Sequence, residues 1–85
     1  MPAKYLSTGK SVRKQLKKLP FHLNEKVVRV FGIIQENPLL GIKLHGDLKN
    51  YYKFRIGDYR IIYKFDKKLS MVEILKVEHR QGVYR

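Results

Sequence analysis

The sequence of 85 residues contains no cysteine and only seven acidic residues. Without cysteine, disulfide bonds, thiolate metal sites and cysteine nucleophiles are excluded. No apolar run approaches the roughly 18 residues that cross a bilayer. The N-terminal segment 1–18 is basic but lacks the continuous apolar stretch of a secretory signal. We therefore expect a cytoplasmic protein that does not associate with a membrane.

Positive charge dominates the composition. Nineteen lysine and arginine residues give a formal net charge of +12 and an isoelectric point near 10.1. A domain of this charge attracts polyanions such as nucleic acid, an acidic protein or an anionic membrane, and it argues against an enzyme for neutral metabolites. The length fits one small domain, residues 1–85.

A first helix is predicted after Ser7 or Thr8, because either residue suits a helix N-cap. The short segment 3–6 before it fits an edge strand. Three apolar residues with i, i+4 and i+7 spacing then share one face of the helix: Val12, Leu16 and Leu19.

A second helix is predicted from about Phe21 to Gln35. It should end before Pro38, because the residue preceding a proline avoids helical backbone. Gly32 weakens the helix by about 1 kcal/mol relative to alanine and suggests a close contact with another element. The apolar stripe of this helix comprises Leu23, Val27, Val30, Phe31 and Ile34.

From Leu48 onward the hydrophobic period changes to two, which predicts three strands. Gly57-Asp58 and the segment 66–68 fit the two tight turns between them. Strict alternation is expected throughout the last strand. One face of that strand should then carry Glu73, Leu75 and Val77.

The predicted order β-α-α-β-β-β belongs to the α+β class, with two helices packed on one face of a small, mainly antiparallel sheet. The other face should stay partly open to solvent. Lys53 and Arg55 are two residues apart and therefore share a face, which Arg60 is a candidate to join. Such a face is a candidate platform for a polyanion.

Two stretches resemble a known protein family. The segment 52–63, YKFRIGDYRIIY, resembles the central hairpin of the RelE/ParE toxin superfamily, and the segment 74–85, ILKVEHRQGVYR, resembles its C-terminal strand and tail. The first half agrees in the order of its elements. The resemblance implies a toxin of a type II toxin–antitoxin system, held inactive by a cognate antitoxin.

The superfamily has two functional branches. One branch contains ribonucleases that cut messenger RNA in the ribosomal decoding site, and the other resembles ParE and poisons DNA gyrase. The ribonuclease branch typically keeps a histidine or arginine near the end of the last strand, followed by a tyrosine, and His79, Arg80 and Tyr84 fit that pattern. We therefore predict an endoribonuclease. The alternatives are a gyrase poison and a non-catalytic RNA-binding module.

RNA cleavage by the 2′-OH needs cations that stabilise the phosphate, and fixed cations can do so without a metal or another cofactor. Arg60 and Arg80 are the predicted phosphate clamps, because a guanidinium grips phosphate bidentately and stays charged. Lys53 and Arg55 are predicted to hold backbone phosphates or to assist proton transfer from the 2′-OH.

Two further residues are candidates for proton transfer. His79 suits an acid or base near neutral pH, and Tyr84 suits stacking on a base or protonation of the leaving oxygen. Glu78 stands where many relatives have glycine. Its carboxylate is expected to reduce the local positive field or to contact His79.

The first predicted helix is a candidate docking surface for ribosomal RNA or for an acidic antitoxin, and its RNA affinity should depend strongly on salt. No acidic residue lies between Met1 and Leu23. The three histidines are scattered without nearby pairs of acidic residues, so no metal site is expected. The basic residues of this surface are Lys10, Arg13, Lys14, Lys17 and Lys18.

Overall fold

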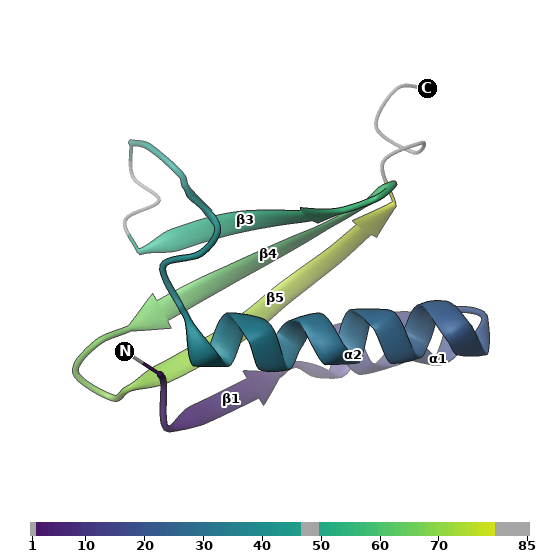
Figure 1. Cartoon of the computed structure of the whole chain (residues 1–85), viewed down its shortest axis with the longest axis horizontal. Helices are drawn as coiled ribbons and strands as arrows, with labels where there is room; N and C mark the ends of the chain where they lie inside the picture. Colours follow the sequence, from purple (N-terminus) through teal and green to yellow (C-terminus); the bar gives the residue numbers. More distant parts are fainter. Residues whose placement is uncertain (1, 47–49, 80–85) are drawn as a thin grey trace.

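The first and last strands of the chain lie side by side. The computed structural model describes residues 2–46 and 50–79, and in it strand β1 (Tyr5–Thr8) pairs in parallel with strand β5 (Met71–His79). Because parallel neighbours need a crossover connection, the helical segment after β1 crosses one face of the sheet (Figure 1).

The remaining strands form an antiparallel meander. Strands β2 (Ile42–Lys43), β3 (Tyr51–Ile56) and β4 (Tyr59–Asp66) complete a five-stranded sheet of order β1-β5-β4-β3-β2. The predicted α+β class and the mainly antiparallel sheet are confirmed. Strand β2 is not among the strands predicted from the sequence, since its two residues are too few to show an alternation.

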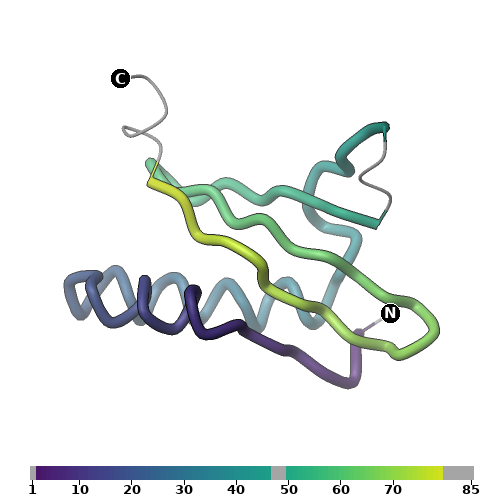
Figure 2. The backbone as a smooth tube through the Cα atoms, turned by 180° about the vertical axis from the view of Figure 1, so that it is seen from behind, coloured from purple at the N-terminus to yellow at the C-terminus, as the bar shows by residue number. Residues whose placement is uncertain are grey.

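Helices α1 (Lys10–Lys18) and α2 (Phe21–Glu36) cover one face of the sheet and leave the other open (Figures 1 and 2). The Asn24 side-chain amide of α2 donates a hydrogen bond to the Leu16 carbonyl of α1 at 2.7 Å, which joins the two helices. In the described part of the chain, neither helix is long and apolar enough to cross a membrane.

The N-terminal boundary of α1 differs from the prediction. Ser7 and Thr8 belong to β1, where they lie opposite Glu73 and Ile74. The N-cap position falls on Gly9, and no side chain in the described residues caps the helix. Pairing with β5 keeps both hydroxyl residues in extended backbone, so the predicted cap is wrong.

The hydrophobic core lies between the two helices and the sheet. Burying one side chain such as valine or isoleucine stabilises a fold by about 1.5–3 kcal/mol. The largest fully buried side chains include Val12, Val27, Ile34, Ile61, Tyr63, Val72 and Ile74.

Gly32 lies on the exposed side of α2, where an added Cβ would meet no atom within 4 Å. The close contact predicted for this glycine is therefore wrong.

Tyr63 fixes the connection between α2 and β2. Its hydroxyl donates a hydrogen bond to the Pro38 carbonyl at 2.8 Å and accepts one from the Gly41 N–H at 2.9 Å. A Cβ on Gly41 would lie 2.7 Å from the Lys53 carbonyl oxygen and 2.8 Å from the Tyr63 hydroxyl. Only glycine lets the chain pass this close to β3, so this contact holds β2 beside it.

Strand β5 contains a bulge, after which its side chains point to the opposite faces of the sheet from those that regular alternation would give. Ile62 lies opposite Lys76, but the next residue, Tyr63, lies opposite Ile74, so Leu75 is an extra residue in the ladder. A bulge of this kind shifts the alternation by one position. Val77 therefore packs in the core with 4% of its surface exposed, and the strict alternation predicted for this strand is wrong beyond Ile74.

Candidate functional site

Three of the predicted site residues share the open face of the sheet. Arg55 of β3 lies directly opposite Arg60 of β4, and Lys53 lies opposite Ile62. Residues opposite each other in an antiparallel pair point to the same side, so the β3–β4 hairpin gathers Lys53, Arg55 and Arg60 on one surface. Arg55 is exposed, while Lys53 and Arg60 are partly buried.

The bulge in β5 brings two more charged residues to this surface. Glu78 lies opposite Arg60, and Lys76 lies opposite Ile62. Without the extra residue Leu75, both side chains would face the helices. The sequence did not reveal Lys76 as a site residue, because a regular alternation placed it with the core positions.

A carboxylate lies among these cations. Glu78 Oε1 is 3.1 Å from Arg60 Nη2 and makes a hydrogen-bonded ion pair with it, and Glu78 Oε2 is 3.5 Å from Lys76 Nζ. The sequence indicated a contact with His79 or a reduced positive field. The contacts observed are with Arg60 and Lys76, and they favour the reduction of the field.

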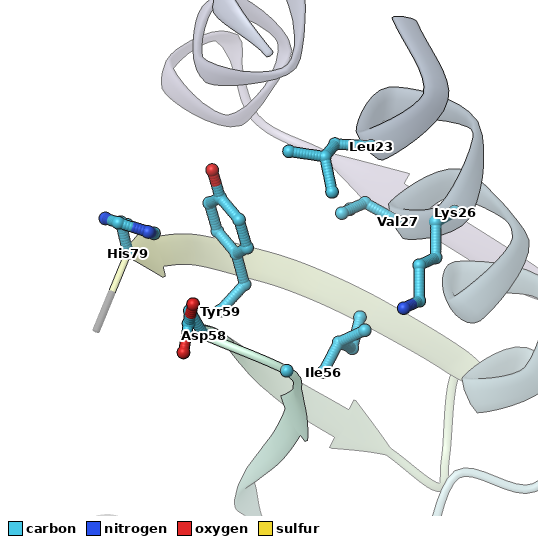
Figure 3. Close-up of a pocket in the computed structure, with 8 residues that line it drawn as sticks. Leu23, Lys26, Val27, Ile56, Asp58, Tyr59 and His79 are labelled. Atoms are coloured by element: carbon cyan, nitrogen blue, oxygen red, sulfur yellow. The ribbon is translucent and has the colours of Figure 1, made fainter. Parts of the chain in front are cut away.

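His79 lies on the other side of the sheet from Arg60. It is opposite Tyr59 in the register, and the two rings are 4.7 Å apart between centroids with an interplanar angle of 49°. Tyr59 points to the helix side of the sheet, as Figure 3 shows. The structure therefore separates His79 from the cations of the open face, whereas the sequence grouped them.

Tyr59 and His79 line an open hollow of about 310 Å³ between α2 and the β3–β4 turn (Figure 3). Leu23 and Val27 of α2 form its apolar wall, as Figure 3 shows, and polar groups lie at its rim. The complete lining comprises Leu23, Lys26, Val27, Ile56, Gly57, Asp58, Tyr59 and His79.

The remaining predicted residues fall into two groups. Arg80 and Tyr84 lie outside the described residues. The five basic residues of α1 are all exposed, while Val12 of the same helix is completely buried. Because α1 packs on the helix-covered face, this basic surface is separate from that of the β3–β4 hairpin. It comprises Lys10, Arg13, Lys14, Lys17 and Lys18.

Within residues 2–46 and 50–79, no group of three or more histidine, cysteine or acidic side chains is arranged to hold a metal ion. The chemistry available on the open face is electrostatic. Lysine and arginine side chains on adjacent strands can hold the oxygens of a phosphodiester and stabilise charge that develops on it.

Comparison with known proteins identifies the protein family. Residues 7–84 match the family described as the ParE toxin of type II toxin–antitoxin system, parDE. Toxin RelG of Mycobacterium tuberculosis is 36% identical over 77 residues, which cover 88% of each chain. Toxin RelE of the same organism is 36% identical over 74 residues, 85% of this chain and 76% of that protein.

A solved structure shares the whole architecture. The toxin–antitoxin complex RelBE2 from Mycobacterium tuberculosis contains a chain that is 33% identical and superimposes with a TM-score of 0.82. The similarity covers 94% of this chain and 94% of that one.

Proposed function

The chain belongs to the RelE/ParE family of toxins from type II toxin–antitoxin systems, and on this basis we propose that it is a metal-independent endoribonuclease that cleaves messenger RNA on the ribosome. The reaction would take place in the cytoplasm, where translation occurs. The observation that carries the proposal is the set of cations on the open face of the β3–β4 hairpin.

The proposed reaction is attack of the RNA 2′-OH on the adjacent phosphate. The 2′-OH gives up its proton in a transfer that Lys53 or Arg55 assists, and the 2′ oxygen forms a bond to phosphorus. The bond to the 5′ oxygen breaks, and the leaving oxygen takes up a proton. Arg60 stabilises the negative charge of the phosphate, and Lys53 and Arg55 hold the neighbouring backbone. Removing one such electrostatic contact typically slows a reaction by about 10²–10³-fold.

Two further residues of this reaction are assigned from the sequence pattern. Arg80 is proposed as a second phosphate clamp, and Tyr84 as the group that stacks on a base or protonates the leaving oxygen. Among the predicted catalytic residues, His79 lies apart from the cations of the open face, because the sheet lies between its ring and Arg60. General acid–base catalysis adds about 10²–10⁴-fold in rate.

We also propose a protein partner. The similar toxin in the RelBE2 complex is bound to its antitoxin, and we infer that a cognate antitoxin inhibits this chain. With a net charge of +12, the chain suits an acidic partner. The exposed cations of α1 are available to that antitoxin or to ribosomal RNA.

A second function has support of its own. The family that matches residues 7–84 is described by its ParE members, and this description supports a poison of DNA gyrase as the second candidate function. A non-catalytic RNA-binding module would use the same basic surfaces without cleavage. Both alternatives give a different result in the following experiment.

The chain would be expressed from a tightly controlled inducible promoter, and the 5′ ends of cellular messenger RNA would be mapped after induction. The variants are Arg60→Ala, Arg80→Ala and Tyr84→Phe. Lys67→Ala is the matched control, because Lys67 is an exposed cation in the β4–β5 turn.

New cuts inside translated reading frames are expected for the wild-type chain and for the control, with few or none for the arginine variants. Growth arrest with DNA breaks and intact messages would support the gyrase function instead. If induction causes neither growth arrest nor cuts, the non-catalytic RNA-binding module is the remaining function.

A further inference from the structure

The open face of the sheet contains a carboxylate that holds two cations at once. Each oxygen of Glu78 has its own partner, Arg60 Nη2 at 3.1 Å and Lys76 Nζ at 3.5 Å. The Glu78 side chain is 23% exposed, against 36% for Arg60 and 59% for Lys76. The anion is therefore the most enclosed of the three, and the cations surround it.

This arrangement fixes the direction of Arg60. The guanidinium reaches toward Glu78 on β5 and therefore away from Arg55 on β3. Its Nε atom is buried and has no hydrogen-bond partner among the residues that the structure describes. Arg60 therefore presents its terminal amino groups, and an ion pair that uses one Nη2 donor leaves the two N–H donors of Nη1 for another acceptor.

The same carboxylate reduces the repulsion between Arg60 and Lys76. Two cations brought to one anion can remain close together, as they must to contact a single phosphate. Lys76 reaches this position because the extra residue Leu75 turns it to the open face. The most exposed cation of the trio thus lies beside the predicted phosphate clamp.

We propose that Glu78 is a positioning residue that acts through Arg60, and that Lys76 is an additional phosphate-binding residue of the same site. The inference rests on the proposed ribonuclease function. The substrate phosphate is then bound between Arg60 and Lys76 on the β4–β5 side of the open face. The opposite effect, in which Glu78 only competes with phosphate for Arg60, is the outcome that the experiment must exclude.

The first test is Glu78→Gln, which removes the charge and keeps the shape. Glu73→Gln is the matched control, since Glu73 lies on the same strand, opposite Lys64 and on the same face as Glu78. Cleavage of a defined message in a purified translation system and affinity for a short single-stranded RNA are both measured. Thermal unfolding midpoints show that each variant is folded.

Cleavage by Glu78→Gln is expected to fall about tenfold or more, because small misplacements of a catalytic group cost up to about 10²-fold. Its RNA affinity should stay equal or increase slightly, since one negative charge is lost. Glu73→Gln should change cleavage by less than about twofold, as surface substitutions elsewhere do. A purely structural role would not separate cleavage from binding in this way.

A double-mutant cycle identifies the residue through which Glu78 acts. In an Arg60→Ala background, Glu78→Gln should cause no further loss of cleavage, because the group that it positions is gone. Lys76→Met should weaken RNA binding. It should also reduce the slope of the logarithm of RNA affinity against the logarithm of salt concentration by about 0.7, the value for one phosphate contact on a single strand. Lys67→Met serves as its charge-matched control.

Cleavage by Glu78→Gln at the wild-type rate or faster would overturn the inference, and so would losses that are additive with Arg60→Ala. At an unchanged or faster rate, the Glu78 carboxylate would only neutralise Arg60 or compete with phosphate for it. If the wild-type chain does not cleave the message, the proposed function and the inference fail together. If the wild-type chain cleaves and the variant is unimpaired, only the inference fails.

Discussion

Arg55 on β3 and Arg60 on β4 lie directly opposite each other on the open face of the sheet. Like charges in this position destabilise an antiparallel pair by about 0.2–1 kcal/mol. Glu78 relieves the repulsion only on the side of Arg60. In the proposed function, the phosphates of a bound RNA would offset this repulsion between the two guanidinium groups.

Replacing Arg55 by alanine should therefore separate stability from activity. The free energy of unfolding is expected to stay equal or rise by a few tenths of a kcal/mol, because repulsion from Arg60 is removed. Messenger RNA cleavage should fall by about tenfold or more, since a phosphate contact is lost. Urea unfolding and cleavage in a purified translation system measure the two effects.

Lys68→Ala is the control for this prediction, since Lys68 is exposed in the β4–β5 turn. It should leave both quantities nearly unchanged. A loss of more than about 1 kcal/mol in Arg55→Ala would indicate instead that the arginine stabilises the sheet.

Tyr63→Phe should destabilise the protein without touching the open face. The variant removes the hydroxyl that joins Pro38 and Gly41, and it leaves a carbonyl and an N–H in need of partners. Such a loss costs about 1–3 kcal/mol, measured by urea unfolding at neutral pH. Tyr51→Phe is the control, since Tyr51 lies on the open face opposite Lys64. An equal loss in both variants would contradict the role of the buried hydroxyl.

The same hydroxyl predicts a pH dependence. Burial raises the pKa of Tyr63 above its ordinary value of 10.0, and the hydrogen bond from Gly41 opposes this effect. A raised pKa in the folded state means that the contribution of the neutral phenol is complete below pH 10 and is lost at higher pH.

The stability difference between wild type and Tyr63→Phe should therefore be constant from neutral pH to about pH 10 and should shrink above it. Urea unfolding of both proteins across this range measures the difference. A difference that grows with alkaline pH would show that the folded state prefers the phenolate, contrary to the burial of the ring.

The sequence predicted the parts of the fold that depend on regular patterns. Helix α2 was predicted from Phe21 to Gln35 and runs from Phe21 to Glu36. The hairpin around Gly57-Asp58 was found because alternation and turn chemistry agree. These elements place Lys53, Arg55 and Arg60 on one face, as the alternation indicated.

The parts that were missed depend on long-range pairing. Ser7 and Thr8 look like helix caps in isolation, and only the parallel contact with β5 makes them strand residues. The extra residue Leu75 has no local signature, so the outward positions of Lys76 and Glu78 were not foreseen. His79 was included in the same site as Arg60 because of the resemblance to the ribonuclease branch, but the bulge in β5 places the two on opposite faces.

The basic surface of α1 gives a prediction in terms of salt. Lys14 and Lys17 are exposed on this helix, and each phosphate contact on single-stranded RNA contributes about 0.7 to the salt slope. The double variant Lys14→Ala, Lys17→Ala should reduce the slope by about 1.4 if both residues contact RNA. Measurement of ribosome or RNA binding over a range of salt concentrations tests this, and an unchanged slope would show that α1 does not contact the RNA.

Two glycines of the chain should respond in opposite ways to the same substitution. Gly41→Ala places a Cβ 2.7 Å from the Lys53 carbonyl oxygen and 2.8 Å from the Tyr63 hydroxyl, and an overpacked site of this kind costs about 1–3 kcal/mol. Gly32→Ala adds a methyl group where no atom lies within 4 Å, and it should stabilise α2 by up to about 1 kcal/mol.

Urea unfolding of both variants measures this contrast, and each serves as the control for the other. Because Gly41 lies against the backbone of Lys53, its variant should also lower messenger RNA cleavage, whereas Gly32→Ala should retain it. A stable Gly41→Ala with full activity would show that β2 can move away from β3 without disturbing the cations of the hairpin. The site would then depend on β3, β4 and β5 alone.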